Sequence, residues 1–330
     1  MKSERNNPLP PVSIQSIGAV TPQGRDLQAI GKRLEQPVAT TPAVLQVNDE
    51  FLSDPAIGSR MRRADRFARM AAVAALDSWA GAKDTCANVP KERIGLIVSS
   101  GFGPHCRGFR FIDGILDCGD SDALPTDFSH SVHGAAAAYI TELLELRGPS
   151  LSTTDFEIGF EQAVLLAQCW LDQQVCDRVL VGAVEEIGEV LVHCASRMLD
   201  EKTFVPGEGA VFMMLAPTDA KGLARLEATT EPRDIDLLML DAPANPSRMA
   251  RQPLLPTRHT TTFSPYFGHS PSSSAFQLLG GFLSLRAGRP LGRPIQNAAH
   301  APAHLEAVDK VATFKPSCDP RVTSLLITKG

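Results

Sequence analysis

The chain has 330 residues, of which 43% are hydrophobic and 21% charged, a composition typical of one large globular domain or two of ordinary size. A net charge of −5 gives no indication of a nucleic-acid partner. No apolar run approaches the roughly 18 residues that cross a bilayer, and the polar, proline-rich start lacks the apolar segment of a signal peptide. Seven cysteines, an odd number without metal-ligand spacing, indicate free and mostly buried thiols in a reducing cytoplasm.

Strand and helix patterns alternate through the first two thirds of the chain. Residues 93–103, RIGLIVSSGFG, form a continuous apolar run that ends in glycine, which is typical of a strand buried on both faces. The elements expected in chain order are a strand at 11–20, a helix at 63–82, a strand at 93–103, helices at 106–116 and 134–146, a strand at 150–154, a helix at about 157–174, and strands at 178–186 and 209–217. This alternation predicts a largely parallel sheet covered by helices on both faces.

The rest of the chain has a weaker pattern. It predicts two short strands within 224–243, a polar and proline-rich loop at 243–267, a helix at 272–288, and terminal strands at 304–314 and 321–330. Ser272 or Ser273 is placed to cap the start of the helix. The two parts share a strand–helix rhythm, which allows an ancient duplication.

Residues 148–186 carry a recognisable set of motifs. Gly-Pro-Ser-Leu at 148–151 leads through a short strand to a buried helix, and Val-Gly-Ala at 181–183 lies in the following strand. This segment resembles the β-ketoacyl synthases of the thiolase superfamily, as do the opening strand, GEGAVFMML at 207–215 and the Gly-His segment at 268–289. The resemblance implies an α/β, thiolase-like fold: two βα halves, 1–217 and a shortened 218–330, in one compact five-layered α-β-α-β-α stack.

The resemblance also shows that the catalytic residues are incomplete. Glu157 stands where the family has its nucleophilic cysteine, and the region 235–249 lacks the first of two catalytic histidines. His269 matches the second histidine, although Ser264 and Pro265 replace the lysine and serine before it. Of the glycine-rich loop that forms part of the oxyanion hole, only Phe314 remains. We therefore expect no condensation by this chain alone, and no cofactor.

Two functions stay open on these residues. In the first, the chain is a chain-length-factor-like partner of an active ketosynthase, in an aryl-polyene or other polyketide or fatty-acid-like system. The second expected partner is an acyl carrier protein that carries the acyl chain on its phosphopantetheine. The tunnel or gate candidates are Phe109, Phe111, Ile112, Leu116 and Phe156, and each could equally be an ordinary core residue. The interface candidates, from the dimer region 128–154, are Phe128, His130, His133, Ser150 and Ser152. In the second, the chain is a stand-alone decarboxylase or thioester hydrolase that uses Glu157 and His269 as an acid/base pair.

Simpler interpretations compete for the remaining polar residues. Glu157 is expected to cap the helix that follows it and to pair with a cation. His130 and His133 lie three residues apart, but a metal site needs a third ligand that the sequence does not provide, so no metal is expected. The cysteines at 169, 176 and 194 are expected to be small buried residues. His105 and His193 carry no signal.

Overall fold

A computed structural model describes residues 9–38, 42–55, 57–119, 123–198, 204–240, 257–295, 307–315 and 324–330. The first part of the chain contains every element that the sequence predicts, with ends shifted by a few residues. Its helices and strands are β1 (Val12–Val20), α1 (Leu27–Leu34), η1 (Asp49–Leu52), η2 (Ser59–Met61), α2 (Arg66–Gly81), α3 (Lys83–Cys86), η3 (Lys91–Arg93), β2 (Ile94–Ser100), α4 (His105–Cys118), α5 (Pro125–Ser131), α6 (Ala135–Leu144), β3 (Ser150–Thr154), α7 (Gly159–Asp172), β4 (Arg178–Glu185), α8 (Glu189–Met198) and β5 (Gly209–Ala216).

The second part corrects one prediction. Its elements are β6 (Ala224–Thr229), β7 (Ile235–Leu240), β8 (Thr257–Thr262), α10 (Ser264–Phe267), α11 (Ser273–Ala287), β9 (Arg293–Pro294), β10 (Lys310–Phe314) and β11 (Ser324–Lys329). The expected loop at 243–267 contains β8 and α10. β8 has no apolar alternation because it lies near the sheet edge, and its β-branched threonines favour a strand when β7 pairs with it.

The strands form one sheet in the order β3-β2-β4-β5-β1-β6-β11-β10-β7-β8-β9. The prediction of a largely parallel sheet is wrong, because six of the ten described strand pairings are antiparallel and four are parallel. The order β3-β2-β4-β5-β1 recurs, read from the other side, as β8-β7-β10-β11-β6. The two series meet where β1 pairs with β6 in antiparallel register through Val12–Ile14 and Ala224–Leu226. This repeat confirms an α/β fold of two related halves, and we infer that the boundary between them lies near residue 217.

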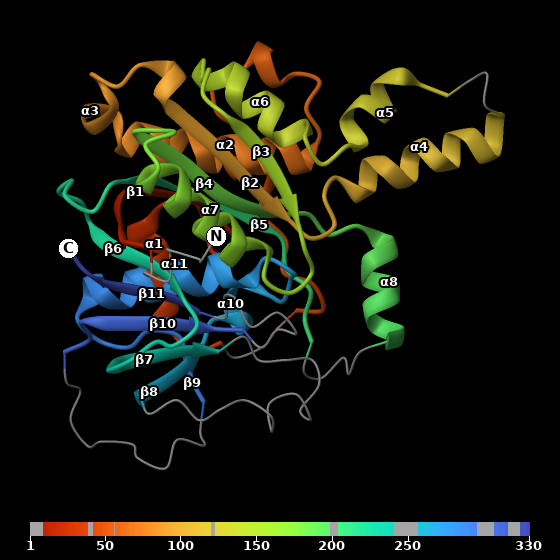
Figure 1. Cartoon of the computed structure of the whole chain (residues 1–330). Helices are drawn as coiled ribbons and strands as arrows, with labels where there is room; N and C mark the ends of the chain where they lie inside the picture. Colours follow the sequence, from red (N-terminus) through yellow and green to blue (C-terminus); the bar gives the residue numbers. More distant parts are fainter. Residues whose placement is uncertain are drawn as a thin grey trace, which may run out of the picture.

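Helices cover the sheet in layers (Figure 1). α2 packs on β1 and β5 on one side of the first half, and α6 packs beside α2, on β2 and β3. α7 and α11 contact each other between the two halves, where α7 packs on β2, β4 and β6 and α11 on β7, β10 and β11. One apolar cluster joins strands of both halves through these two helices, including Phe160, Val181, Met213, Phe282 and Val311. Residues 241–256 and 296–306 lie outside the described residues.

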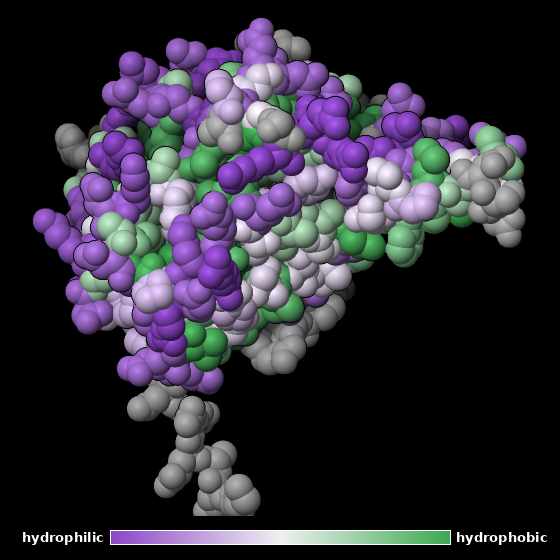
Figure 2. All heavy atoms as spheres, turned by 90° about the horizontal axis from the view of Figure 1, so that it is seen from above, coloured by the Kyte–Doolittle hydropathy of each residue, from purple (hydrophilic) through white to green (hydrophobic). Residues whose placement is uncertain are grey.

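α4 and α5 project from this body (Figure 1). No residue of α4 is buried. The two helices hold each other through the rings of Phe111 and Phe128, whose centroids are 5.5 Å apart, and through Arg107 Nη1, 2.7 Å from Asp127 Oδ1. Figure 2 shows apolar side chains along one side of this projection, bordered by hydrophilic residues. Among the helices described, none combines the length and apolar character that a membrane span requires.

Candidate functional site

The turn between β3 and α7 holds the residue at the family's nucleophile position. α7 begins at Gly159 with Ile158 at its N-cap, so Glu157 precedes the helix instead of capping it, which corrects the prediction. The oxygen that receives the exposed amides is Asp155 Oδ1, which lies 2.7 Å from both Glu157 N and Ile158 N. The shorter aspartate side chain folds back over its own turn, which glutamate does less readily. Glu157 is half-buried, next to Phe156, whose side chain is 62% exposed.

His269 is held with one ring nitrogen available. Its Nδ1 lies 3.2 Å from Val205 N and 3.1 Å from Val205 O, and its ring stacks on Phe204 with centroids 4.9 Å apart. Its Nε2 is buried and has no hydrogen-bond partner among the residues described. Because an unsatisfied buried polar atom is costly, the arrangement suits a polar ligand atom at this position.

The other remnants of the family's site lie elsewhere or outside the described residues. Phe314 ends β10 and packs in a small core cluster with Ile235, Leu238 and Leu240. The chain that follows, 316–323, lies outside the described residues, as does 241–249, where the family has its first histidine. The structure therefore describes Glu157 and His269 but not the complete set of catalytic positions.

The gate candidates of α4 face two ways. Phe109, Ile112 and Leu116 follow one face of the helix, at intervals of three and four residues, and are 36%, 51% and 75% exposed. Phe111 lies on the other side, against Phe128 of α5. An ordinary core role is therefore wrong for the first three residues in this chain.

A groove of about 770 Å³ separates α4 from α8. Its α4 wall includes Cys106, Phe109 and Asp113, and its α8 wall includes Val190 and His193. Phe109 thus borders both the exposed apolar face of α4 and this groove.

The interface candidates lie on β3, at the free edge of the sheet, and on or just after α5. β3 is an end strand that pairs with β2 alone among the described strands. Ser150 on it is exposed and Ser152 half-buried. Phe128 is 56% exposed and His133 is exposed. His130 differs, because its Nε2 lies 3.0 Å from the hydroxyl of Tyr139 in α6 and so has a partner within the chain.

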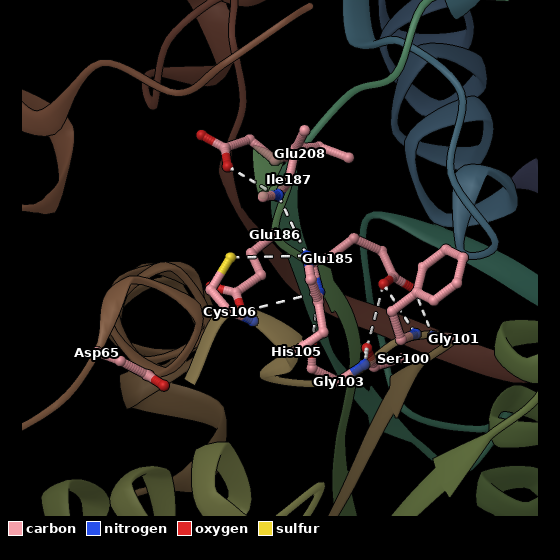
Figure 3. A network of polar contacts seen from close by, with 12 residues as sticks. Asp65, Ser100, Gly101, Gly103, His105, Cys106, Glu185, Glu186, Ile187 and Glu208 are labelled. Carbon is pink, nitrogen blue, oxygen red and sulfur yellow. Dashed lines mark hydrogen bonds and ion pairs between the residues drawn. The ribbon is translucent and has the colours of Figure 1, made fainter. Parts of the chain in front are cut away.

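A buried carboxylate, Glu185, lies at the end of β4 (Figure 3). Its Oε1 accepts hydrogen bonds from Gly101 N at 2.5 Å and from Ser272 Oγ at 2.6 Å, and burial raises the pKa of its carboxyl. Ser272 holds the N-cap position of α11 but makes no side-chain cap there, since its hydroxyl donates to Glu185. The predicted cap is therefore replaced by a link between the two halves of the fold.

Glu208, which precedes β5, is fully buried in an ion pair. Its Oε1 lies 2.5 Å from Arg66 Nη2 and accepts from Val47 N at 2.9 Å, while Oε2 accepts from Ile187 N at 3.2 Å. These bonds use both carboxylate oxygens, which is how a buried charge is tolerated. The pair ties the start of α2 to the β4–β5 connection.

Glu186 forms a third group with the first turn of α4 (Figure 3). Its Oε1 accepts from Cys106 N at 2.9 Å and lies 3.8 Å from His105 Nδ1. His105 Nε2 lies 3.6 Å from Cys106 Sγ. Burial, with Asp65 and Glu208 nearby, raises the pKa of Glu186 to about 7. Burial and Glu186 raise the pKa of Cys106 to about 12, and burial lowers that of His105.

Sequence reasoning missed this group. The available signal was Glu185-Glu186 directly after an apolar strand, because acidic residues at that position lie at the sheet's carboxyl edge. His105 gave no signal, since Glu186, which completes the group, is about 80 residues away in the chain. The prediction of a buried cysteine is confirmed for Cys176, whereas Cys169 is half-buried, and burial raises the pKa of both thiols. The prediction is wrong for Cys194, which is exposed on α8.

The fold and the site can now be compared with known proteins. The family model "Beta-ketoacyl synthase, N-terminal domain" matches residues 15–220, so the chain belongs to the β-ketoacyl synthase family. No curated protein matches its sequence.

Solved structures of the same fold cover nearly the whole chain. A ketosynthase in complex with its chain length factor from Xenorhabdus doucetiae is 14% identical, with a TM-score of 0.75 and 100% of both chains covered. The ishigamide ketosynthase/chain length factor is 14% identical, with a TM-score of 0.75 over 97% of this chain and 98% of the other. A β-ketoacyl synthase from Burkholderia phymatum STM815 is 14% identical, with a TM-score of 0.76 over 97% of this chain and 99% of the other. At these identities the likeness shows the thiolase-like fold.

Proposed function

We propose that this chain is a non-condensing, chain-length-factor-like subunit that pairs with an active β-ketoacyl synthase and shapes the tunnel for the growing acyl chain. The observation that carries the proposal is the exposed apolar face of α4, Phe109, Ile112 and Leu116, on a helix that buries none of its residues. Solvent-exposed apolar faces of this kind mark a surface that a partner covers.

The residue at the nucleophile position supports a role without condensation. A condensing enzyme needs a thiolate that accepts the acyl group, and Glu157 offers a carboxylate, whose acyl anhydride is unstable in water. An ionised Glu157 would also repel a malonyl carboxylate by about 4 kcal/mol at ~4 Å and an effective dielectric of ~20. The acyl chain would therefore start on the partner's cysteine and extend along the shared interface.

The expected partners follow from this role. The free edge of β3, with Ser150 and Ser152, together with the exposed Phe128 and His133, supplies the surface for a ketosynthase. The substrate would arrive on acyl carrier protein as a phosphopantetheine thioester. Two of the similar solved structures are assemblies of these types, namely a ketosynthase with its chain length factor and a type II polyketide ketosynthase with an acyl-carrier protein. An aryl-polyene or related polyketide is the product class that we propose.

A stand-alone decarboxylase or thioester hydrolase is the second candidate. The buried, unpartnered Nε2 of His269 favours it, because this nitrogen, when it carries the ring proton, could stabilise a developing oxyanion. The test is co-expression with a neighbouring ketosynthase, followed by size exclusion and assay of each species. A stable heterodimer with an inert lone chain supports the subunit role, whereas an active, self-sufficient homodimer supports the hydrolase or decarboxylase.

Product length tests the gate. In the reconstituted pair, Phe109→Ala should lengthen the carrier-bound product by about one two-carbon unit, because a packed interior yields no space unless a side chain is removed. Ile112→Ala should act in the same direction. Phe111→Ala is the matched control, since its ring packs against Phe128 within the chain. Unchanged product mass in the first two variants, with the complex intact, would remove the gating role from α4.

A further inference from the structure

The first turn of α4 and the end of β4 bring together three side chains of the types that bind transition metals. One ligand atom each from His105, Cys106 and Glu186 lies within 4.8 Å of the other two. We propose that these residues form a binding site for a divalent metal ion of the zinc type, with a fourth coordination position open to the groove between α4 and α8. This site is independent of the proposed role as a ketosynthase partner.

The distances suit tetrahedral coordination. Zn–S and Zn–N bonds of ~2.3 and ~2.0 Å at a tetrahedral angle place sulfur and nitrogen about 3.5 Å apart. Cys106 Sγ and His105 Nε2 are 3.6 Å apart. Glu186 already lies against both residues, through Cys106 N and His105 Nδ1. Thiolate, imidazole and carboxylate together favour zinc over magnesium or calcium.

The surroundings of the three side chains are negative. Asp65 and Glu208 both raise the pKa of Glu186 through their charges. Oδ2 of Asp65 is buried without a hydrogen-bond partner among the residues described. Two arginines lie nearby: Arg66 is already bound to Glu208 and Asp49, and Arg107, whose charge also acts on Asp65, is bound to Asp127. A divalent ion would balance this excess of negative charge, and it would stabilise the anionic forms of Cys106 and Glu186 that burial disfavours.

Gly188 lies close to both proposed ligands. A Cβ atom on Gly188 would lie 2.5 Å from Cys106 Sγ and 3.0 Å from His105 Nε2, so a side chain there would displace both ligand atoms. Gly188 N donates to His105 Nε2 at 3.1 Å, which shows that this nitrogen is deprotonated and presents a lone pair. Coordination would replace this hydrogen bond. Cys106 also lines the groove of about 770 Å³, which provides an entry path and room for a water as fourth ligand.

Proton release gives the site a measurable signature. Coordination converts the Cys106 thiol to a thiolate and releases one proton. Zinc affinity should therefore rise with pH through the neutral range.

The test uses the full chain, alone or with its co-expressed partner, after treatment with a chelator. Titration with Co²⁺ should give one equivalent of binding, with a thiolate-to-cobalt charge-transfer band and the visible bands of a tetrahedral ion. Cys106→Ser should remove the charge-transfer band. Cys118→Ser, at the exposed far end of the same helix, and Cys194→Ser, on α8, are controls that should keep it.

Two further variants keep the proposal falsifiable if Cys106→Ser fails to fold. Glu186→Gln retains an oxygen for the Cys106 amide and should weaken zinc binding at least tenfold, measured by competition with a chromophoric chelator. Gly188→Ala should block binding, with circular dichroism as a check on folding. A charge-transfer band that survives Cys106→Ser, zinc affinity unchanged in Glu186→Gln, or no stoichiometric binding by the wild-type chain would overturn the proposal.

Discussion

α7 and α4 differ in where they place their apolar residues, although each follows the carboxyl end of a strand in the same half of the fold. α7 buries Phe160, Val164 and Leu171 between the two halves. α4 is also rich in large apolar residues but buries none of them in this chain. The first helix stabilises the fold itself, whereas the second has a surface that we assign to a partner.

The difference shows that helical apolar spacing predicts a covered face but not what covers it. A core helix and an interface helix share the same intervals of three and four residues. The distinction comes from tertiary position: α7 contacts β2, β4 and α11, whereas the main contact of α4 is α5. Substitutions on the two helices should therefore have different effects on the lone chain and on the complex.

The largest expected effect is on α7. Phe160→Ala should lower the free energy of unfolding of the lone chain by about 3–5 kcal/mol, because the ring is fully buried and its loss leaves a cavity. Denaturant unfolding with an unchanged m-value measures this. A loss below about 1 kcal/mol would contradict the assignment of α7 to the core.

A somewhat smaller effect concerns the carboxylates beneath α4. In the folded chain the pKa of Glu186 is about 7, against an ordinary value of 4.5, so the folded state holds a proton that the unfolded state has lost between these pH values. The contribution of Glu186 to the free energy of unfolding therefore falls by about 3 kcal/mol from pH 4.5 to 7 and is constant above that.

Glu186→Gln isolates this contribution from those of its neighbours. His105 and Cys106 face Glu186, and Asp65, Glu208 and the Arg66–Glu208 pair lie nearby, but all are retained in the variant. The measurement is the free energy of unfolding of the variant minus that of the wild type, with a chelator present. This difference should increase with pH up to about 7. A difference that does not vary with pH would show that Glu186 ionises with its ordinary pKa.

An effect of about 1 kcal/mol is expected in the turn before α7. Asp155→Ala removes the oxygen that accepts from Glu157 N and Ile158 N, and loss of such a cap costs about that much. Glu157→Ala should cost less, and should leave product formation by the complex within about tenfold of wild type. A thousandfold loss of turnover in an assembled complex would make Glu157 catalytic.

Much of the first half of the fold could be predicted because its signals are local. The strand at 150–154 and the helix after it follow from apolar runs and glycine boundaries, and their motifs identified the family. β8 was missed because a threonine-rich strand is defined by its pairing with β7 and not by its own pattern.

The chemistry of the site was harder to predict for the same reason. Ser272 and Glu157 occupy positions typical of caps, but Ser272 bonds Glu185 instead, and Asp155 competes better for the amides before α7. The group formed by His105, Cys106 and Glu186 depends on the packing of β4 against the loop after β2. Spacing along the chain does not contain that information, whereas the sheet order does.

The smallest expected change in the stability of the lone chain is on α4, and it tests most directly whether α4 is an interface helix while α7 is a core helix. Ile112→Ala and Leu116→Ala should change the stability of the lone chain by less than about 0.5 kcal/mol, because both side chains are already more than half exposed. In the heterodimer the same substitutions remove apolar contacts at the centre of an interface, where truncations commonly cost more than about 1 kcal/mol of binding free energy. Calorimetric titration of the partner ketosynthase and unfolding of the lone chain measure the two quantities separately. If either variant destabilises the lone chain by as much as Phe160→Ala does, α4 packs against its own chain in solution, and the surface assigned to the partner is part of the core.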